Sequence, residues 1–317
     1  MPESSGRAGF RGALRSEFTK IRSTPSTYWT LLALVVITIA IGALASFAAA
    51  RNVDAGGRYF DPTNRSLDGL YLGQLIIAAL GALTITSEYS TGMIRTSLTV
   101  MPRRGVVFAA KAVAFGVVAF VTGLVTSFGA FFLGQALMSG KHISASLGQP
   151  NVLRAVIGAA LYLTVCGLLA LGIGTVLRRT AGAITASVAL LLVMPLLVTT
   201  LPQTWQNDVN KWVPAYAGGG IFATKPDPTD PPIAHDFSAW TGFAVFAMYA
   251  AIALIGAMAA FRSRDAAPGR IPRGPLSEPG QRQAGGEQHE PPGHRAQRAF
   301  QRGQQRDLVE RDHLAVG

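Results

Sequence analysis

The sequence has few charged residues and a single cysteine. Of its 317 residues 14% are charged, against about 25% in an ordinary soluble domain, while 49% are hydrophobic. Such a composition is typical of a chain buried in lipid. The lone cysteine, Cys166, lies inside an apolar run, so neither an intramolecular disulfide nor a metal site built on several thiolates is expected.

The sequence also lacks the motifs of common enzymatic chemistry. It contains no Gly-x4-Gly-Lys-Ser/Thr phosphate loop, no Gly-x-Ser-x-Gly elbow and no His-Glu-x-x-His pair. Its five histidines show no metal-ligand spacing: His142, His235, His289, His294 and His313. We therefore predict that the chain has no catalytic residue, binds no metal or cofactor and cannot cradle ATP in the usual way.

Six uncharged apolar runs are present, each long enough to cross a hydrocarbon core of about 30 Å. None contains an ionisable carboxylate or amine, which argues against an ion-coupled carrier. The first run begins too late and is too long for a cleavable signal peptide. The sequence predicts an all-α integral membrane protein with six transmembrane helices, at residues 28–50, 69–86, 112–138, 155–177, 181–201 and 240–261.

The basic residues fall mainly on one side of these spans. Acidic and basic residues balance in the segments that follow the odd-numbered spans, so the net charge of +11 lies on the opposite side. The positive-inside rule then places both termini in the cytoplasm. This distribution explains the charge without a nucleic-acid partner, and the lipid bilayer is the partner expected instead.

The two ends of the chain differ from the spans. Apolar residues at Phe10, Leu14, Phe18 and Ile21 form one stripe among basic residues, which predicts a helix lying along the inner membrane surface; a solvated terminus is the alternative. Gly, Pro, Gln and Arg dominate after Arg264 and predict a disordered tail. The expected organisation is 1–27 cytoplasmic N-terminus, 28–264 six-span domain and 265–317 basic tail.

Uncharged polar residues occur inside the spans and are candidates for a translocation path. Hydrogen bonds between packed helices are the alternative use of such side chains. Pro195 should kink the fifth span. The candidates are Gln74 and Thr84 in the second span, and Thr122, Thr126 and Gln135 in the third.

The segment between the second and third spans, SEYSTGMIRTSLTVMPRRG, combines an acid, three arginines and a proline. Ile94, Leu98 and Met101 have helical spacing, and Pro102 should end that helix. We expect Arg103, Arg104 and Lys111 to mark the membrane surface. The segment predicts a short cytoplasmic helix, with a basic loop that only sets topology as the alternative.

Three stretches resemble the type-two ATP-binding-cassette exporter permeases of bacteria. They are SEYSTGMIRTSLTVMPRRGVVFAAK at 87–111, LPQTWQNDVNKWVPAYAGGGIF at 201–222, and the N-terminal LRSEFTKIRSTPSTYW. The resemblance covers about residues 10–264. It implies a bacterial cell-membrane permease that pairs with a second permease subunit, as a homodimer or heterodimer, and with a separate ATPase that uses ATP and Mg. It also implies short outer helices before span six.

In the family that the chain resembles, the loop after the second span holds a coupling helix that docks into the ATPase. The resemblance implies that Glu88, Gly92 and Arg95 shape it: Glu88 near the helix start suits the positive end of the dipole, Gly92 permits close approach, and Arg95 offers planar hydrogen bonding. The expected coupling residues are Glu88, Tyr89, Gly92, Arg95, Leu98, Pro102 and Arg103.

The function that these observations predict is the membrane-spanning subunit of an ATP-driven exporter. A membrane-anchored regulatory or scaffold protein and a secondary carrier are the alternatives. The uncharged spans favour an amphipathic or hydrophobic cargo such as a drug, a lipid or a peptide, with a polymer or a role in cofactor assembly as the alternatives.

Overall fold

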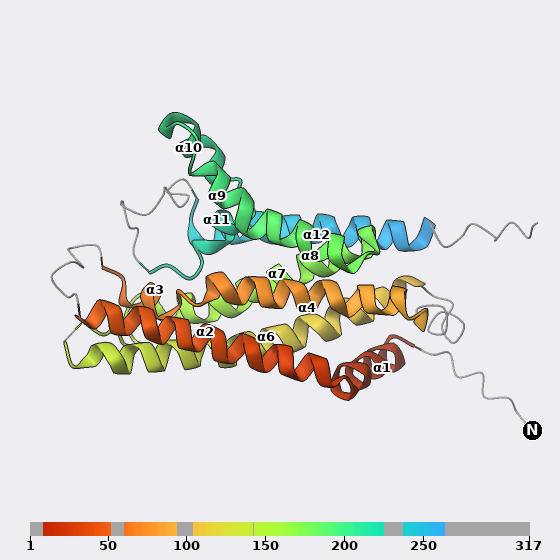
Figure 1. Ribbon diagram of the computed structural model, residues 1–317, viewed down its shortest axis with the longest axis horizontal. Helices are drawn as coiled ribbons and strands as arrows, with labels where there is room; N and C mark the ends of the chain where they lie inside the picture. Colours follow the sequence, from red (N-terminus) through yellow and green to blue (C-terminus); the bar gives the residue numbers. More distant parts are fainter. Residues whose placement is uncertain (1–8, 52–59, 94–103, 142, 225–236, 264–317) are drawn as a thin grey trace, which may run out of the picture. The chain divides into compact units, whose positions relative to one another are not determined.

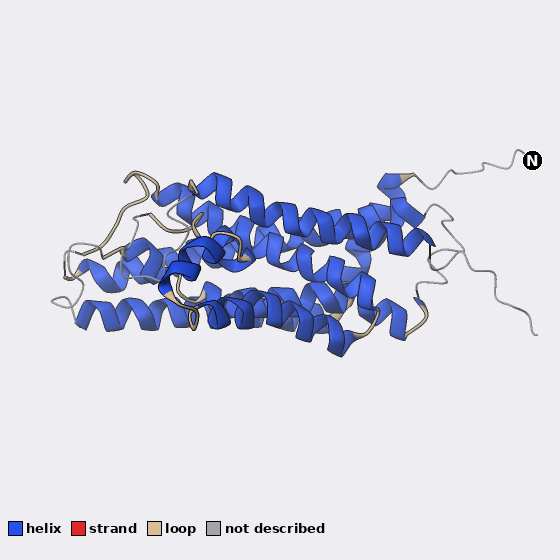
Figure 2. Ribbon diagram, turned by 90° about the horizontal axis from the view of Figure 1, so that it is seen from above, coloured by secondary structure: helices blue, strands red, loops and turns tan. Residues whose placement is uncertain are grey.

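The computed structural model describes residues 9–51, 60–93, 104–141, 143–224 and 237–263. Helices account for nearly all of these residues, and the described ranges contain no strand (Figure 2). The long helices are α2 (Pro25–Arg51), α4 (Leu70–Ser90), α6 (Arg104–Ser139), α7 (Val152–Leu177) and α12 (Ala239–Ser263). The sixth apolar span lies between α7 and α12 in the sequence and runs from Thr180 to Val198, so it is the fifth in chain order.

The predicted all-α fold with six apolar spans is confirmed, because six helices in the described ranges are long and apolar enough to cross a membrane. Two of them extend beyond the predicted uncharged runs by about a turn or more at the ends that face each other in the sequence. α4 continues to Ser90 and α6 already begins at Arg104. Both extensions lie toward the loop between these helices, and they bring Glu88 and Lys111 into regular helix.

α7 lies at the centre of the bundle, between α4, α6 and α12 (Figure 1). In its most apolar window 72% of the residues are buried, against 17% in α12 and 22% in α2. Small residues let its backbone approach its neighbours: a side chain at Gly81 of α4 would collide with the carbonyl of Gly167. Close packing of this kind holds helices together in lipid, where apolar burial gives little advantage.

The fifth span is not a uniform α-helix. It consists of α8 (Thr180–Val188), a π-helical turn (Ala189–Val193) and α9 (Met194–Val198). In the π turn the N–H of Met194 bonds to the carbonyl of Ala189, five residues earlier. Pro195, which has no N–H to donate, follows directly, so the irregularity lies where the proline predicted a kink.

The short helices lie at the two ends of the bundle (Figure 1). α1 (Phe10–Ser23) lies at the end where α4 finishes, and α3 (Pro62–Ser66) lies at the opposite end. Two short helices precede the last span, as predicted: α10 (Gln203–Asn210) and α11 (Pro214–Gly219).

Candidate functional site at the ends of α1, α4 and α6

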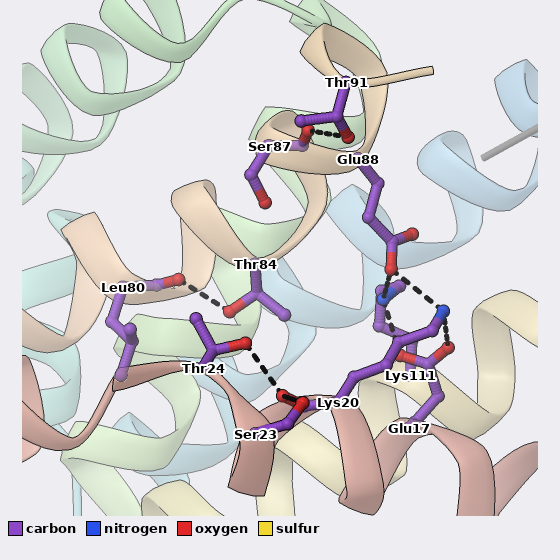
Figure 3. A network of polar contacts seen from close by, with 10 residues as sticks. All are labelled: Glu17, Lys20, Ser23, Thr24, Leu80, Thr84, Ser87, Glu88, Thr91 and Lys111. Atoms are coloured by element: carbon purple, nitrogen blue, oxygen red, sulfur yellow. Dashed lines mark hydrogen bonds and ion pairs between the residues drawn. The ribbon is translucent and has the colours of Figure 1, made fainter. Parts of the chain in front are cut away.

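Four charged side chains from three helices meet where α4 ends and α6 begins (Figure 3). Lys111 Nζ of α6 lies 2.6 Å from Glu17 Oε2 of α1 and 2.7 Å from Glu88 Oε1 of α4. Lys20 Nζ of α1 lies 2.7 Å from Glu17 Oε1 and 3.1 Å from Glu88 Oε1. Two carboxylates and two ammonium groups thus form a neutral set, which we call the charge cluster.

Most of the charge cluster is removed from solvent. The side chains of Lys111, Glu17 and Glu88 are 4%, 5% and 8% exposed, whereas that of Lys20 is 26% exposed. Burying a charge costs several kcal/mol unless an opposite charge compensates it at hydrogen-bonding distance. Here each buried group contacts two groups of opposite sign, so removal of one member leaves a buried charge only partly compensated.

The pKa values of the two α1 residues report this balance. Burial by itself raises the pKa of Glu17, but Lys111 and Lys20 together outweigh burial and hold that pKa below its ordinary value of 4.5. Burial likewise lowers the pKa of Lys20, but Glu17 and Glu88 together raise it above 10.5. Both groups are therefore charged at neutral pH.

The charge cluster also determines which face of α1 is buried. Ala13 and Glu17, one helical turn apart, are buried against the bundle, while Phe10 of the predicted apolar stripe is 43% exposed. The helix itself was predicted, but the burial of its charged residue Glu17 was not. Its position along a membrane surface stays a prediction.

Lys111, which the sequence suggested marks the membrane surface, is buried within the bundle, and its level relative to the membrane stays a prediction. It lies about two turns into α6 and is 3% exposed. Because Glu88 and Lys111 flank residues 94–103 in the sequence, the two helices that lead into and out of this segment meet at one point and contact α1 there.

The structure corrects the expected position of Glu88. It lies in the last turn of α4, not near a helix start, so it faces the negative end of that helix's dipole. Lys111 and Lys20 supply the compensating positive charge. Glu88 therefore belongs to the helix of the second span. An acidic side chain suits this buried position because it compensates the charge of Lys111.

Gly92 has a conformational role within this chain, while the close approach to a partner that the resemblance implied stays a prediction. Its φ is +70°, in the left-handed region, and a Cβ placed on it would meet no atom within 4 Å. A glycine suits this position because L side chains disfavour that backbone conformation. Gly92 thus lets the chain leave α4 immediately after Thr91, the C-terminal cap.

Tyr89 packs against the hydrophobic core and extends the contacts at this end of the bundle. The guanidinium of Arg178, which follows α7, lies 5.1 Å from the centre of the Tyr89 ring. Arg178 Nη2 also donates to the carbonyl of Ala260 in α12, at 3.5 Å. The end of α4 is therefore linked to α7 and α12 as well as to α1 and α6.

Part of the predicted coupling site lies outside the described residues. This holds for Arg95, Leu98, Pro102 and Arg103, and with them for the predicted short helix. Their role in contacting an ATPase stays a prediction.

The candidates for a translocation path occupy separate environments. Thr84 donates to the carbonyl of Leu80, and Thr126 donates to that of Thr122, so both hydroxyls bond within their own helices. Gln74 is buried between helices, where it accepts a hydrogen bond from the Tyr162 hydroxyl.

Gln135 connects the far end of α6 to its loops. Its Nε2 donates to the carbonyl of Pro62 at 3.0 Å, and its Oε1 accepts from the N–H of Ala145 at 2.7 Å. This is the structural use of polar residues that the sequence left open as the alternative. Of the five candidates, Gln74 lines a cavity between α4, the fifth span and α11.

Sequence reasoning did not bring the charge cluster together. Lys111 directly precedes the uncharged run 112–138, and Glu17 and Lys20 lie three residues apart on the N-terminal helix. The sequence feature that could have predicted the charge cluster is that charged residues occur near the ends of three helices, all expected on the same side of the membrane.

The six apolar helices and their packing around α7 define a multi-pass α-helical membrane protein. A family model described as ABC-2 family transporter protein matches residues 13–195, more than half of the chain. The chain therefore belongs to the ABC-2 transporter family, and the resemblance seen in the sequence is confirmed. A search of the curated proteins found no match. The matched range contains the whole charge cluster but not α10, α11 or α12.

Proposed function

We propose that the chain is the permease subunit of an ATP-driven exporter in the bacterial cell membrane, with both termini in the cytoplasm. It forms the translocation path together with a second permease subunit. A separate ATP-binding-cassette ATPase uses ATP and Mg and supplies the energy. Membership of the ABC-2 family supports this assignment, as does the lack of a phosphate-binding loop in the sequence.

The observation that carries the proposal is the charge cluster at the base of segment 94–103. A force that an ATPase applies to this segment reaches Glu88 through the end of α4 and Lys111 through the start of α6. Because these groups are buried and paired, they cannot separate without leaving charges uncompensated. The two spans and α1 therefore move as one unit, which allows a cytoplasmic event to switch the bundle between two packings.

The test is to express the full chain with a candidate ATP-binding-cassette ATPase, sought among the neighbouring genes, and to purify the complex in detergent. We expect co-purification and, after reconstitution, ATP-dependent export. Replacement of the ATPase's ATP-binding lysine should abolish export. A scaffold would show no transport, and a secondary carrier would transport without the ATPase, so either result would reject the proposal.

The coupling segment is tested by charge reversal at Arg95. Arg95→Glu should insert normally but retain less ATPase on purification and lose export, because an arginine's planar hydrogen bonds cannot be replaced by a carboxylate. Lys141→Glu, an exposed charge beyond the far end of α6, is the matched control. Equal ATPase retention by both variants would exclude the coupling role of Arg95.

A further inference from the structure

A cavity of about 210 Å3 lies between α4, the fifth span and α11. We call it the α4–α9–α11 cavity. None of the residues that line it is charged. Its wall combines apolar side chains such as Leu191 and Phe222 with the polar side chains of Gln74, Tyr216 and Thr199.

Gln74 presents an unused hydrogen-bond donor to this cavity. Its side chain is 2% exposed, and its Oε1 accepts from the hydroxyl of Tyr162. Its Nε2 has no hydrogen-bond partner in the part of the chain that the structure describes. This N–H is not fully enclosed by the protein, so an acceptor oxygen of a ligand in the cavity can hydrogen-bond to it.

The hydroxyl groups of Tyr216 and Thr199 at the cavity are already engaged. The Tyr216 hydroxyl donates to the carbonyl of Pro195 at 3.2 Å, and the hydroxyl of Thr199 donates to that of Leu196. Burial raises the pKa of Tyr216, so this phenol stays neutral. Among the lining residues, the buried amide of Gln74 and the half-buried amide of Asn64 thus remain available for hydrogen bonding, in a wall that is otherwise mainly apolar and carries no charge.

Local structure holds the cavity open. The π-helical turn precedes Pro195 and brings Leu191 and Leu192 to the wall, and such turns are common at functional sites. On the opposite side Asp61 Oδ2 accepts from the N–H of Thr224 at 2.7 Å. Arg154 Nη2 donates to the carbonyl of Ala223, also at 2.7 Å. These bonds fix the segment that follows α11.

We propose that the α4–α9–α11 cavity binds the uncharged, mainly apolar part of the exported molecule, with an acceptor oxygen on Gln74. An apolar cavity of roughly 150 Å3 holds benzene, so this one has room for a group of on the order of ten non-hydrogen atoms. A charged group is excluded because no lining residue would compensate it. The inference rests on the proposed function, since it makes the ligand the transported molecule.

The probe is benzophenone, which is uncharged, carries one carbonyl acceptor and inserts into nearby C–H bonds on illumination. One phenyl ring with the carbonyl, about eight non-hydrogen atoms, is the part that the cavity has room for. It is added to the purified full chain in lipid nanodiscs, and labelled peptides are identified by mass spectrometry. We expect labelling to concentrate on peptides from α4, α9 and α11. The anionic analogue 4-benzoylbenzoate should label these peptides about tenfold less.

Glycine substitutions provide a matched pair of variants. A Cβ on Gly219, which lines the cavity, would lie 3.7 Å from the Phe222 ring, and one on Gly220 would meet no atom within 4 Å. Gly219→Leu should fill the cavity and lower labelling about tenfold, whereas Gly220→Leu should not. Leu196→Trp, at a lining residue that is 64% exposed, fills the cavity without disturbing packed core and should act like Gly219→Leu.

The outcomes separate this inference from the proposed function. Equal labelling of the Gly219→Leu, Leu196→Trp and Gly220→Leu proteins would overturn the cavity site even if ATP-dependent export is demonstrated. Cavity labelling that does not change the ATPase rate of the assembled complex would overturn the substrate role. Cavity labelling by a chain that associates with no ATPase would instead refute the exporter function alone and leave a binding site.

Discussion

Replacing Lys111 by methionine tests the charge cluster most directly. Methionine keeps much of the length of the side chain but removes the charge that contacts Glu17 at 2.6 Å and Glu88 at 2.7 Å. The two buried carboxylates then share only Lys20, which is 26% exposed. Removing one partner of a buried ion pair costs about 3–5 kcal/mol, equivalent to roughly a 100- to 5,000-fold change in an equilibrium constant.

This cost should appear as undocking of α1. Because α1 packs mainly on α6, loss of Lys111 removes its strongest polar contact with that helix. Hydrogen exchange of the α1 peptides, measured in nanodiscs at pH 7, should accelerate by about two orders of magnitude or more. The acceleration should shrink at lower pH, where a carboxylate that has lost its partner takes up a proton.

A second substitution provides the control for charge. In Lys111→Met with Glu17→Gln, one carboxylate and one ammonium remain, Glu88 and Lys20, which already lie 3.1 Å apart. This double variant should recover part of the lost protection. If Lys111→Met leaves the exchange of α1 unchanged, or if the double variant is the less protected of the two, the charge cluster does not hold α1.

Three further predictions concern other parts of the fold. The protection of α1 against hydrogen exchange, corrected for intrinsic rates, should be constant between about pH 5 and 10. It should fall in acid as Glu17 is protonated, because the folded-state pKa of Glu17 lies below 4.5. It should fall in base as Lys20 is deprotonated, because the folded-state pKa of Lys20 lies above 10.5. Gly92→Ala should cost about 1–2 kcal/mol in thermal unfolding because of its φ of +70°, and Gly140→Ala, also in open space, should cost less. Gln135→Leu should destabilise by about 2–4 kcal/mol, because the Pro62 carbonyl and the Ala145 N–H lose their partner; an unchanged melting temperature would refute that.

The spans could be predicted because lipid imposes a simple rule on sequence. A helix must satisfy its own backbone and present some twenty apolar residues, so composition and run length were enough to find all six. The family resemblance was also readable, because it depends on the order of residues along the chain rather than on their distances. The ends of the spans were less predictable, since Glu88 and Lys111 interrupt the uncharged runs although both lie in helix.

The sequence by itself determined the class of protein and the number of spans. Only the tertiary structure decided that Glu17, Glu88 and Lys111, from three different helices, compensate one another. Only it showed Gln74 facing a cavity while Gln135 bonds to the start of α3 and to the loop after α6. The physical reason is that hydropathy is a property of neighbours in sequence, whereas the cost of a buried charge or amide depends on partners that packing brings from elsewhere.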